Sequence, residues 1–217
     1  MSTERFEKLS KDKRQRILDA AREEFARVPY EEASINQIIK NAGISRGSFY
    51  TYFEDKKDLL QYIFRDEGEK NSQFLREIVL ENQGDFWKSI RDYTKRVAGY
   101  MKKGSIQQSI NLFTQTNMVR RLVDWVEIDM KEREENEKEQ LDWMMEHLDL
   151  RLIDTRGSKE RLGVILKSAH MISFLALFNM LTHPGMDEDI ILKEFNTQID
   201  LLRYGAGKEA EKPTEAR

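Results

Sequence analysis

The chain has 217 residues, of which 39% are hydrophobic and 35% charged, and its formal net charge at pH 7 is −3. This length allows one domain, or a small domain joined to a larger one. The absence of cysteine excludes disulfides, zinc-thiolate sites and cysteine nucleophiles. The start of the chain lacks the pattern of a signal peptide, and no run of about 18 apolar residues occurs. We therefore expect a cytoplasmic protein with no membrane partner.

The N-terminal quarter of the chain carries the first helical pattern. Only three prolines occur in the sequence, and apolar residues recur at steps of three and four rather than alternating, which favours an all-α fold. Ile17, Ala21 and Phe25 lie on one face of a helix expected from about Lys11 to Val28. Pro29 follows directly and should end that helix.

Two short helices joined by a tight turn should come next. Ser34 precedes the first of them, Ile35 to Asn41, and Gln37 stands three residues later, as in a capping box. Gly43 supplies the turn, and Ser45 caps the second helix, from about Arg46 to Tyr52. This arrangement is that of a helix-turn-helix, whose second helix can enter a major groove about 12 Å wide.

The rest of the chain should also be helical. Asp55 is the expected cap of a fourth helix that extends to about Leu80. We divide the chain into a helix-turn-helix domain (1–60), a larger helical domain (61–204) and a disordered tail (205–217). Within the larger domain, further helices are expected at 85–102, 106–117, 119–149, 159–183 and 187–203.

Residues 34–60 carry a specific set of positions that resembles the signature of TetR-family regulators. The resemblance rests on Ser34, the turn Ala42-Gly43-Ile44-Ser45, Gly47, the cluster Tyr50, Tyr52 and Phe53, and then Lys56 and Leu59. With the first helix it covers about a quarter of the chain. One position departs from the pattern, because Ile39 stands where the family usually has a small alanine.

The resemblance implies that the second short helix reads operator DNA. It assigns base contacts to Arg46, Gly47, Ser48 and Thr51, among which Arg46 can pair bidentately with guanine. Phosphate contacts, which fix register without reading sequence, are assigned to Ser34, Ser45, Tyr50, Tyr52 and Lys56. The alternative for Tyr52 is that its ring packs against the first helix.

The resemblance also implies a homodimer that binds a small molecule and is released from its operator when it does. The last two helices should form the dimer contact, although either stripe could instead be intrachain core, which is the commoner role of such stripes. The stripes are Leu162, Ile165, Leu166, Ala169, Ile172, Ala176 and Asn179 in the first helix, and Ile191, Phe195, Ile199 and Leu202 in the second. Aromatic and methionine side chains are the candidates for a pocket that takes an apolar or aromatic effector: Phe86, Trp87, Tyr93, Tyr100, Phe113, Trp125, Met144, Phe174 and Phe178.

Two other classes of function compete with a regulator, which is expected to be a repressor without catalytic residues, metal or cofactor. The first is an enzyme, which the scattered histidines and the lack of a glycine-rich phosphate loop disfavour. The second is a helical interaction protein that does not bind DNA. Binding of operator DNA distinguishes the regulator from both.

Overall fold

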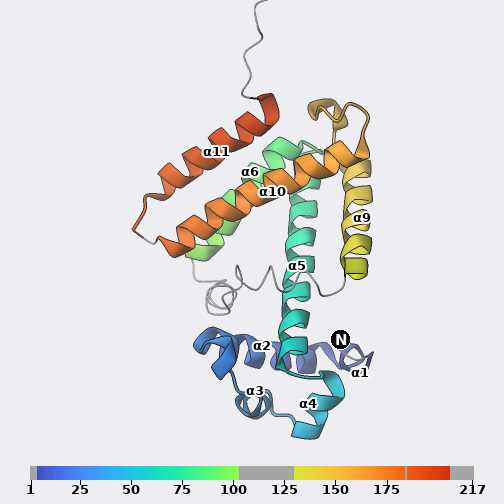
Figure 1. Cartoon of the computed structure of the whole chain (residues 1–217), viewed down its shortest axis with the longest axis vertical. Coiled ribbons are helices and arrows are strands. Elements are labelled where there is room, and N and C mark those ends of the chain that lie inside the picture. Colours follow the sequence, from blue (N-terminus) through green and yellow to red (C-terminus); the bar gives the residue numbers. More distant parts are fainter. Residues whose placement is uncertain (1–3, 103–129, 184, 206–217) are drawn as a thin grey trace, which may run out of the picture. The chain divides into compact units, whose positions relative to one another are not determined.

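The structure is a computed structural model that describes residues 4–102, 130–183 and 185–205 (Figure 1). The described residues form helices joined by short turns, and no strand occurs among them, as expected for an all-α fold. The helix predicted at 106–117 and the first part of the one predicted at 119–149 lie outside the described residues. The tail beyond residue 205 lies outside them too.

The observed helices follow the predicted ones closely. All but three of them were expected, and the bounds near the N-terminus agree within one or two residues. The elements are α1 (Glu4–Glu7), α2 (Lys11–Arg27), the 3-10 turn η1 (Tyr30–Glu32), α3 (Ile35–Ala42), α4 (Arg46–Tyr52), α5 (Lys56–Glu81), α6 (Phe86–Lys102), α9 (Met130–His147), the 3-10 turn η2 (Leu150–Leu152), α10 (Lys159–Thr182) and α11 (Glu188–Tyr204). The unpredicted elements are α1, η1 and η2.

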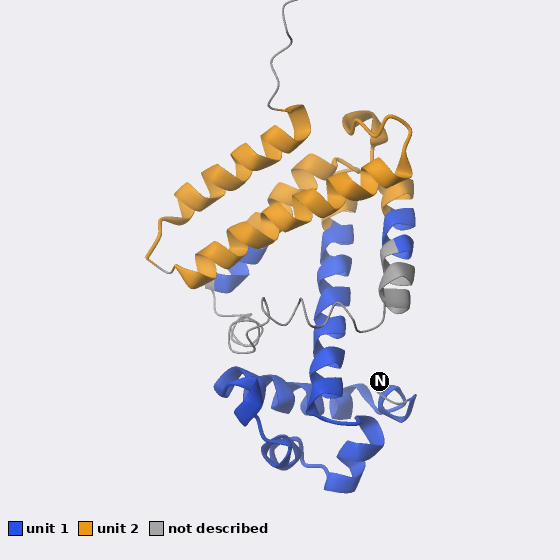
Figure 2. Cartoon of the chain, viewed as in Figure 1, with its two compact units in different colours: residues 1–77, 97–143 blue, residues 78–96, 144–217 orange. Residues whose placement is uncertain are grey.

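The chain forms two compact units, coloured in Figure 2. Unit 1 comprises residues 1–77 and 97–143, and unit 2 comprises residues 78–96 and 144–217. Helix α5 is continuous from Lys56 to Glu81, so it runs through residue 60, where we expected the first domain to end. That boundary stays a prediction.

Unit 1 contains a closed aromatic and aliphatic core, formed by residues of α1 to α4 and the first turns of α5. We call residues 4–64 the head. The predicted stripe of α2 points into this core, since Ile17, Ala21 and Phe25 have no solvent exposure. Burial of an isoleucine or phenylalanine side chain contributes about 1.5 to 3 kcal/mol. The other fully buried members are Phe6, Ile38, Phe49, Phe53, Leu59, Leu60 and Ile63.

The short helix α1 belongs to the head, although the sequence pattern gave no sign of it. Phe6 is fully buried and its ring lies 4.6 Å from that of Phe53 and 5.0 Å from that of Tyr62, centroid to centroid. A third ring, that of Tyr52, lies 5.8 Å away. One N-terminal side chain therefore packs against the end of α4 and the start of α5.

Unit 2 is built around the antiparallel pair α10 and α11 (Figure 1). Leu162, Ala169 and Ala176 of α10 are buried, as is the polar Ser173, whose hydroxyl lies 2.7 Å from that of Thr94 on α6. The predicted stripe of α11 is buried too, at Ile191, Phe195 and Ile199. The sequence left open whether these stripes form a dimer contact or intrachain core. Their buried members form intrachain core.

Candidate nucleic-acid interface

The turn between α3 and α4 is fixed by backbone hydrogen bonds. Gly43 has φ 65° and ψ 39°, the left-handed conformation that glycine adopts at little cost. The N–H of Ile44 donates to the carbonyl of Ile39 at 3.2 Å, and that of Gly43 to the carbonyl of Lys40 at 3.3 Å. This is the Schellman type of helix end. The predicted role of Gly43 is confirmed.

Ser45 caps helix α4 as predicted. Its Oγ accepts a hydrogen bond from the backbone N–H of Ser48 at 3.0 Å, and the two hydroxyl oxygens lie 2.9 Å apart. A cap of this kind contributes about 1 kcal/mol to helix stability. The first turn of α4 is therefore set before any ligand binds.

The predicted capping box at the start of α3 is wrong. The Ser34 side chain makes no cap hydrogen bond, and its backbone N–H donates to Oε1 of Glu24 at 2.9 Å. Gln37 instead donates to Asn41 at 2.8 Å. The reason lies in the tertiary structure. Glu24 is buried on α2 and forms an ion pair with Arg27 at 2.8 Å. Its carboxylate accepts the hydrogen bond from the backbone N–H of Ser34 that the Gln37 side chain was expected to accept.

Helix α4 has one face in the core and one face in solvent. Phe49 and the following Phe53 are fully buried, whereas Arg46, Gly47 and Tyr50 are exposed. Ser48 and Thr51 are half-buried, and the Thr51 hydroxyl donates back to the carbonyl of Gly47 at 2.9 Å. The structure therefore brings all four predicted base-contacting residues together on the first two turns of this helix.

Arg46 is held by two neutral side chains. Nη1 donates to Oδ1 of Asn36 on α3 at 3.0 Å, and Nη2 donates to the Tyr50 hydroxyl at 3.4 Å. The guanidinium carbon also lies 5.6 Å from the centroid of the Tyr50 ring, within the range of a cation–π contact. Asn36 had no role in the sequence prediction, because its position becomes meaningful only once α3 and α4 are placed side by side.

Two of the predicted phosphate contacts have structural roles in the head. Lys56 Nζ donates to the carbonyls of Tyr30, Glu31 and Ala33 at 2.8, 2.9 and 3.2 Å, and lies 4.8 Å from the centroid of the Tyr30 ring. An ammonium group has three N–H donors, so these carbonyls engage all of them. Tyr52 is 8% exposed, and its ring packs on that of Phe6 within the core of the head.

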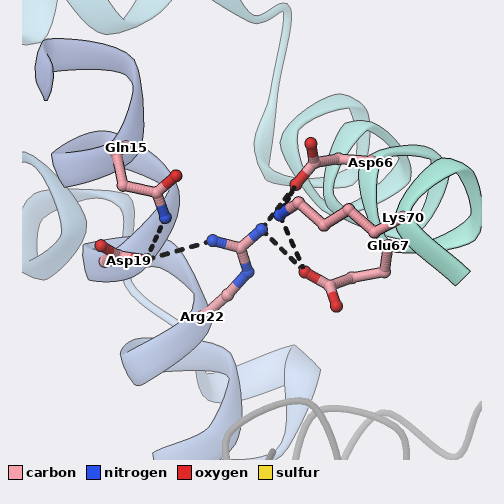
Figure 3. A network of polar contacts seen from close by, with 6 residues as sticks. All are labelled: Gln15, Asp19, Arg22, Asp66, Glu67 and Lys70. Atoms are coloured by element: carbon pink, nitrogen blue, oxygen red, sulfur yellow. Dashed lines mark hydrogen bonds and ion pairs between the residues drawn. The ribbon is translucent and has the colours of Figure 1, made fainter. Parts of the chain in front are cut away.

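A cluster of charges joins α2 to α5 within unit 1 (Figure 3). The side chain of Arg22 is 6% exposed and donates to Asp66 at 2.7 Å, to Glu67 at 2.9 Å and to Asp19 at 3.1 Å. Lys70 adds a second cation, 2.7 Å from Asp66. The sequence showed these charges only as members of amphipathic helices. The cluster fixes α5 against α2, which in turn packs on α3.

The predicted pocket residues fall into three groups. Phe86, Trp87, Tyr93 and Met144 are buried in unit 2, and Trp87 Nε1 donates to the carbonyl of Leu152 at 2.8 Å. Phe174 and Phe178 of α10 are partly exposed and stack at a centroid distance of 6.0 Å, while Tyr100 in unit 1 is 43% exposed. The last group, Phe113 and Trp125, lies outside the described residues.

Residues 17–63 match the family model described as bacterial regulatory proteins, tetR family. The fatty acid metabolism regulator protein of Bacillus subtilis (strain 168) is 37% identical over 68 residues, which are 31% of this chain and 34% of that protein. The HTH-type transcriptional regulator AcrR of Shigella flexneri is 35% identical over 77 residues, 36% of this chain and 34% of that protein. The match spans about a third of the length of these curated relatives.

Solved structures extend the likeness in fold to nearly the whole chain. A putative TetR-family transcriptional regulator from Syntrophomonas wolfei has a TM-score of 0.62 at 16% identity, over 92% of this chain and 99% of that one. A TetR-like regulator from Rhodococcus sp. RHA1 has a TM-score of 0.53 at 17% identity, over 89% and 97%. The fold and the interface are those of a helix-turn-helix protein with a helical body. Residues 17–63 therefore carry the N-terminal domain of the tetR family of bacterial regulatory proteins.

Proposed function

We propose that the chain is a sequence-specific DNA-binding transcription regulator that represses its target genes from an operator. The observation that carries the proposal is the outer side of α4, where the exposed Arg46 and Gly47 lie with the half-buried Ser48 and Thr51. The buried Phe49 anchors this helix in the core. Exposed donors on a pre-formed helix are what direct readout in a major groove requires. Its relatives, which are named as regulators, favour this function over that of an enzyme.

Within this proposal, Arg46, Ser48 and Thr51 read bases, and Gly47 lets the helix backbone approach the DNA closely. Tyr50, which is 47% exposed, and the serines Ser34 and Ser45 contact phosphates. Lys56 and Tyr52 act first by holding the head in shape, since their polar or apolar groups are engaged within it. Any phosphate contact of Lys56 requires that one of its three carbonyl bonds is exchanged.

A gel-shift assay with the DNA upstream of the protein's own gene, at low and high salt, tests the proposal. We expect a sequence-specific complex that weakens as salt rises, because phosphate contacts release counterions. Arg46→Ala should lower the preference at one base position, whereas Lys56→Ala should weaken binding to all sequences alike. Absence of a specific, salt-sensitive complex contradicts DNA regulation, and equal effects of both variants on every sequence contradict the division of roles.

We further propose that the protein acts as a homodimer through the exposed apolar side of α10 and α11. Among the described residues, α10 is the one helix that could cross a membrane by length and composition, and 17% of its apolar window is buried within the chain. A second copy that covers this side would remove it from water. The exposed side chains are Val164, Met171, Leu175, Ile190, Leu201 and Tyr204. These differ from the residues we predicted for the contact, which are mostly internal.

The two heads of such a dimer would read half-sites about 34 to 36 Å apart, or a multiple of that distance. An apolar or aromatic effector would release the operator by binding better to a conformation in which this spacing is lost. Of the predicted pocket residues, Phe174 and Phe178 best support an effector site, because their stacked rings are partly exposed. Trp87 is fully packed and serves the core of unit 2.

A further inference from the structure

The readout assigned to Arg46 requires that its side chain is held in place. An arginine has about 2 kcal/mol of rotamer entropy, and pairing with guanine through two parallel hydrogen bonds fixes both the position and the plane of its guanidinium group. Arg46 is the first residue of α4 and is exposed, so packing alone does not orient it. The polar neighbours of Arg46 therefore decide where its charge lies.

Asn36 is the neighbour that reaches Arg46 from another helix. It is the second residue of α3, it is exposed, and its Oδ1 accepts from Nη1 of Arg46 at 3.0 Å. The turn at Gly43 and the core residues beneath both helices fix the distance between α3 and α4. The bond therefore links Arg46 to a rigid frame. Tyr50, one turn further along α4, supports the guanidinium from its own helix.

The partners of Arg46 leave its charge and most of its donors available. Asn36 and Tyr50 are neutral, and none of the described carboxylates forms an ion pair with Arg46. Two of the five N–H groups of the guanidinium are engaged, so three remain for a base or a phosphate. An acidic partner would have neutralised the cation that DNA attracts, whereas an amide orients it without that loss.

We propose that Asn36 is a positioning residue for base recognition: it holds the guanidinium of Arg46 across the turn between α3 and α4, so that the base preference of Arg46 depends on Asn36. The inference rests on the proposed function of the α4 face. It assigns a specificity role to a side chain of the first helix of the helix-turn-helix, acting through another residue.

The test uses the full-length protein and a library of duplex DNA with a randomised central segment. DNA bound by the wild type is recovered and sequenced, and the affinity of each variant is then measured on the enriched sequence and on its single-base changes. Asn36→Ala should lower the preference at the Arg46 position about 10-fold, because a hydrogen bond to a charged group is lost. Affinity for unrelated DNA and the melting temperature should stay unchanged, since Asn36 is exposed.

Two further variants separate positioning from other roles. Asn41→Ala makes the same change at the other end of α3, where Asn41 is exposed and contacts Gln37, and it should leave the base preference intact. Asn36→Asp keeps an acceptor for Arg46. It should therefore retain the base preference while weakening binding to all DNA, because it adds a negative charge near the phosphates.

The double variant Arg46→Ala with Asn36→Ala decides how Asn36 acts. If Asn36 works through Arg46, adding Asn36→Ala to Arg46→Ala changes the base preference no further. A further loss at a separate base position shows that Asn36 reads DNA itself and overturns the positioning role. The positioning role is also wrong if the wild type enriches a sequence and Asn36→Ala binds that sequence with the same base preference. A wild type that enriches no sequence contradicts the proposed function, and the positioning role with it.

Discussion

The head and the pair α10 and α11 differ in how far their apolar side chains are buried. In the head, Phe6, Phe25 and Phe53 have no solvent exposure, and the exposed side of α4 is mainly polar. In the C-terminal pair, Met171 and Leu201 are 57% and 50% exposed. The head closes a core within one chain, whereas the pair leaves apolar side chains exposed in the single chain. We therefore expect the head to fold by itself and the C-terminal pair to form the dimer contact.

The largest expected effect tests whether the head is closed by its N-terminal residues. Phe6→Ala should lower the free energy of unfolding by about 3 to 5 kcal/mol, because it leaves a cavity among three aromatic rings. Urea unfolding measures the change, and Arg5→Ala, an exposed neighbour, is the control. A loss below about 1 kcal/mol would show that α1 is not part of the folded head.

The charge cluster of Figure 3 should give the next largest effect. Arg22→Ala removes the buried cation from Asp66 and Glu67, and we expect a loss of about 3 kcal/mol in the free energy of unfolding. Lys70→Ala removes a cation whose side chain is 53% exposed and should cost less than about 1 kcal/mol. Equal losses for the two variants would mean that burial does not set the strength of this cluster.

The apolar side of α10 should control the oligomeric state. Leu175→Glu places a charge on a residue that is 48% exposed in the single chain, and it should weaken the dimer at least about 10-fold while leaving the fold intact. Sedimentation equilibrium measures the association. Lys88→Glu, an exposed change on α6, should leave the dimer unaffected.

Two results would contradict this assignment. A wild type that sediments as a monomer at all concentrations shows that no second copy covers α10. Flotation of that monomer with lipid vesicles would assign the apolar side to a membrane instead, a partner that we do not expect for this chain.

The smallest expected effect is a pH dependence of the head. Burial, with the hydrogen bond and charge of Glu7, raises the pKa of Tyr62 to about 12. Because the pKa of the folded state lies above the unfolded value of about 10, the stability linked to this proton is complete below pH 10 and is lost as pH rises toward 12. Melting temperatures of the wild type should fall more steeply across that window than those of Tyr62→Phe. Identical slopes would show that folding does not raise the pKa of Tyr62.

Local chemistry made much of the fold predictable. The four-residue recurrence of Ile17, Ala21 and Phe25 predicted α2 and its buried face, and Gly43 and Ser45 predicted the turn and the cap of α4. These signals could be read because they depend on residues within a few positions of each other. The short helix α1 escaped prediction, since a single phenylalanine has no periodicity and becomes core only against rings distant in the sequence.

The sequence by itself determined the helical fold, the helix-turn-helix and the set of polar residues at the start of α4. Only the tertiary structure decided which partner each polar group takes. In the folded chain the N–H of Ser34 donates to Glu24, the ammonium group of Lys56 donates to three carbonyls, and the guanidinium group of Arg46 donates to Asn36. The tertiary structure also buried part of the predicted dimer stripes, including Leu162, Ala169 and Phe195, and left Met171 and Leu175 exposed. The physical reason is that periodicity records how apolar a helix face is, whereas burial and hydrogen bonding depend on which helix lies opposite.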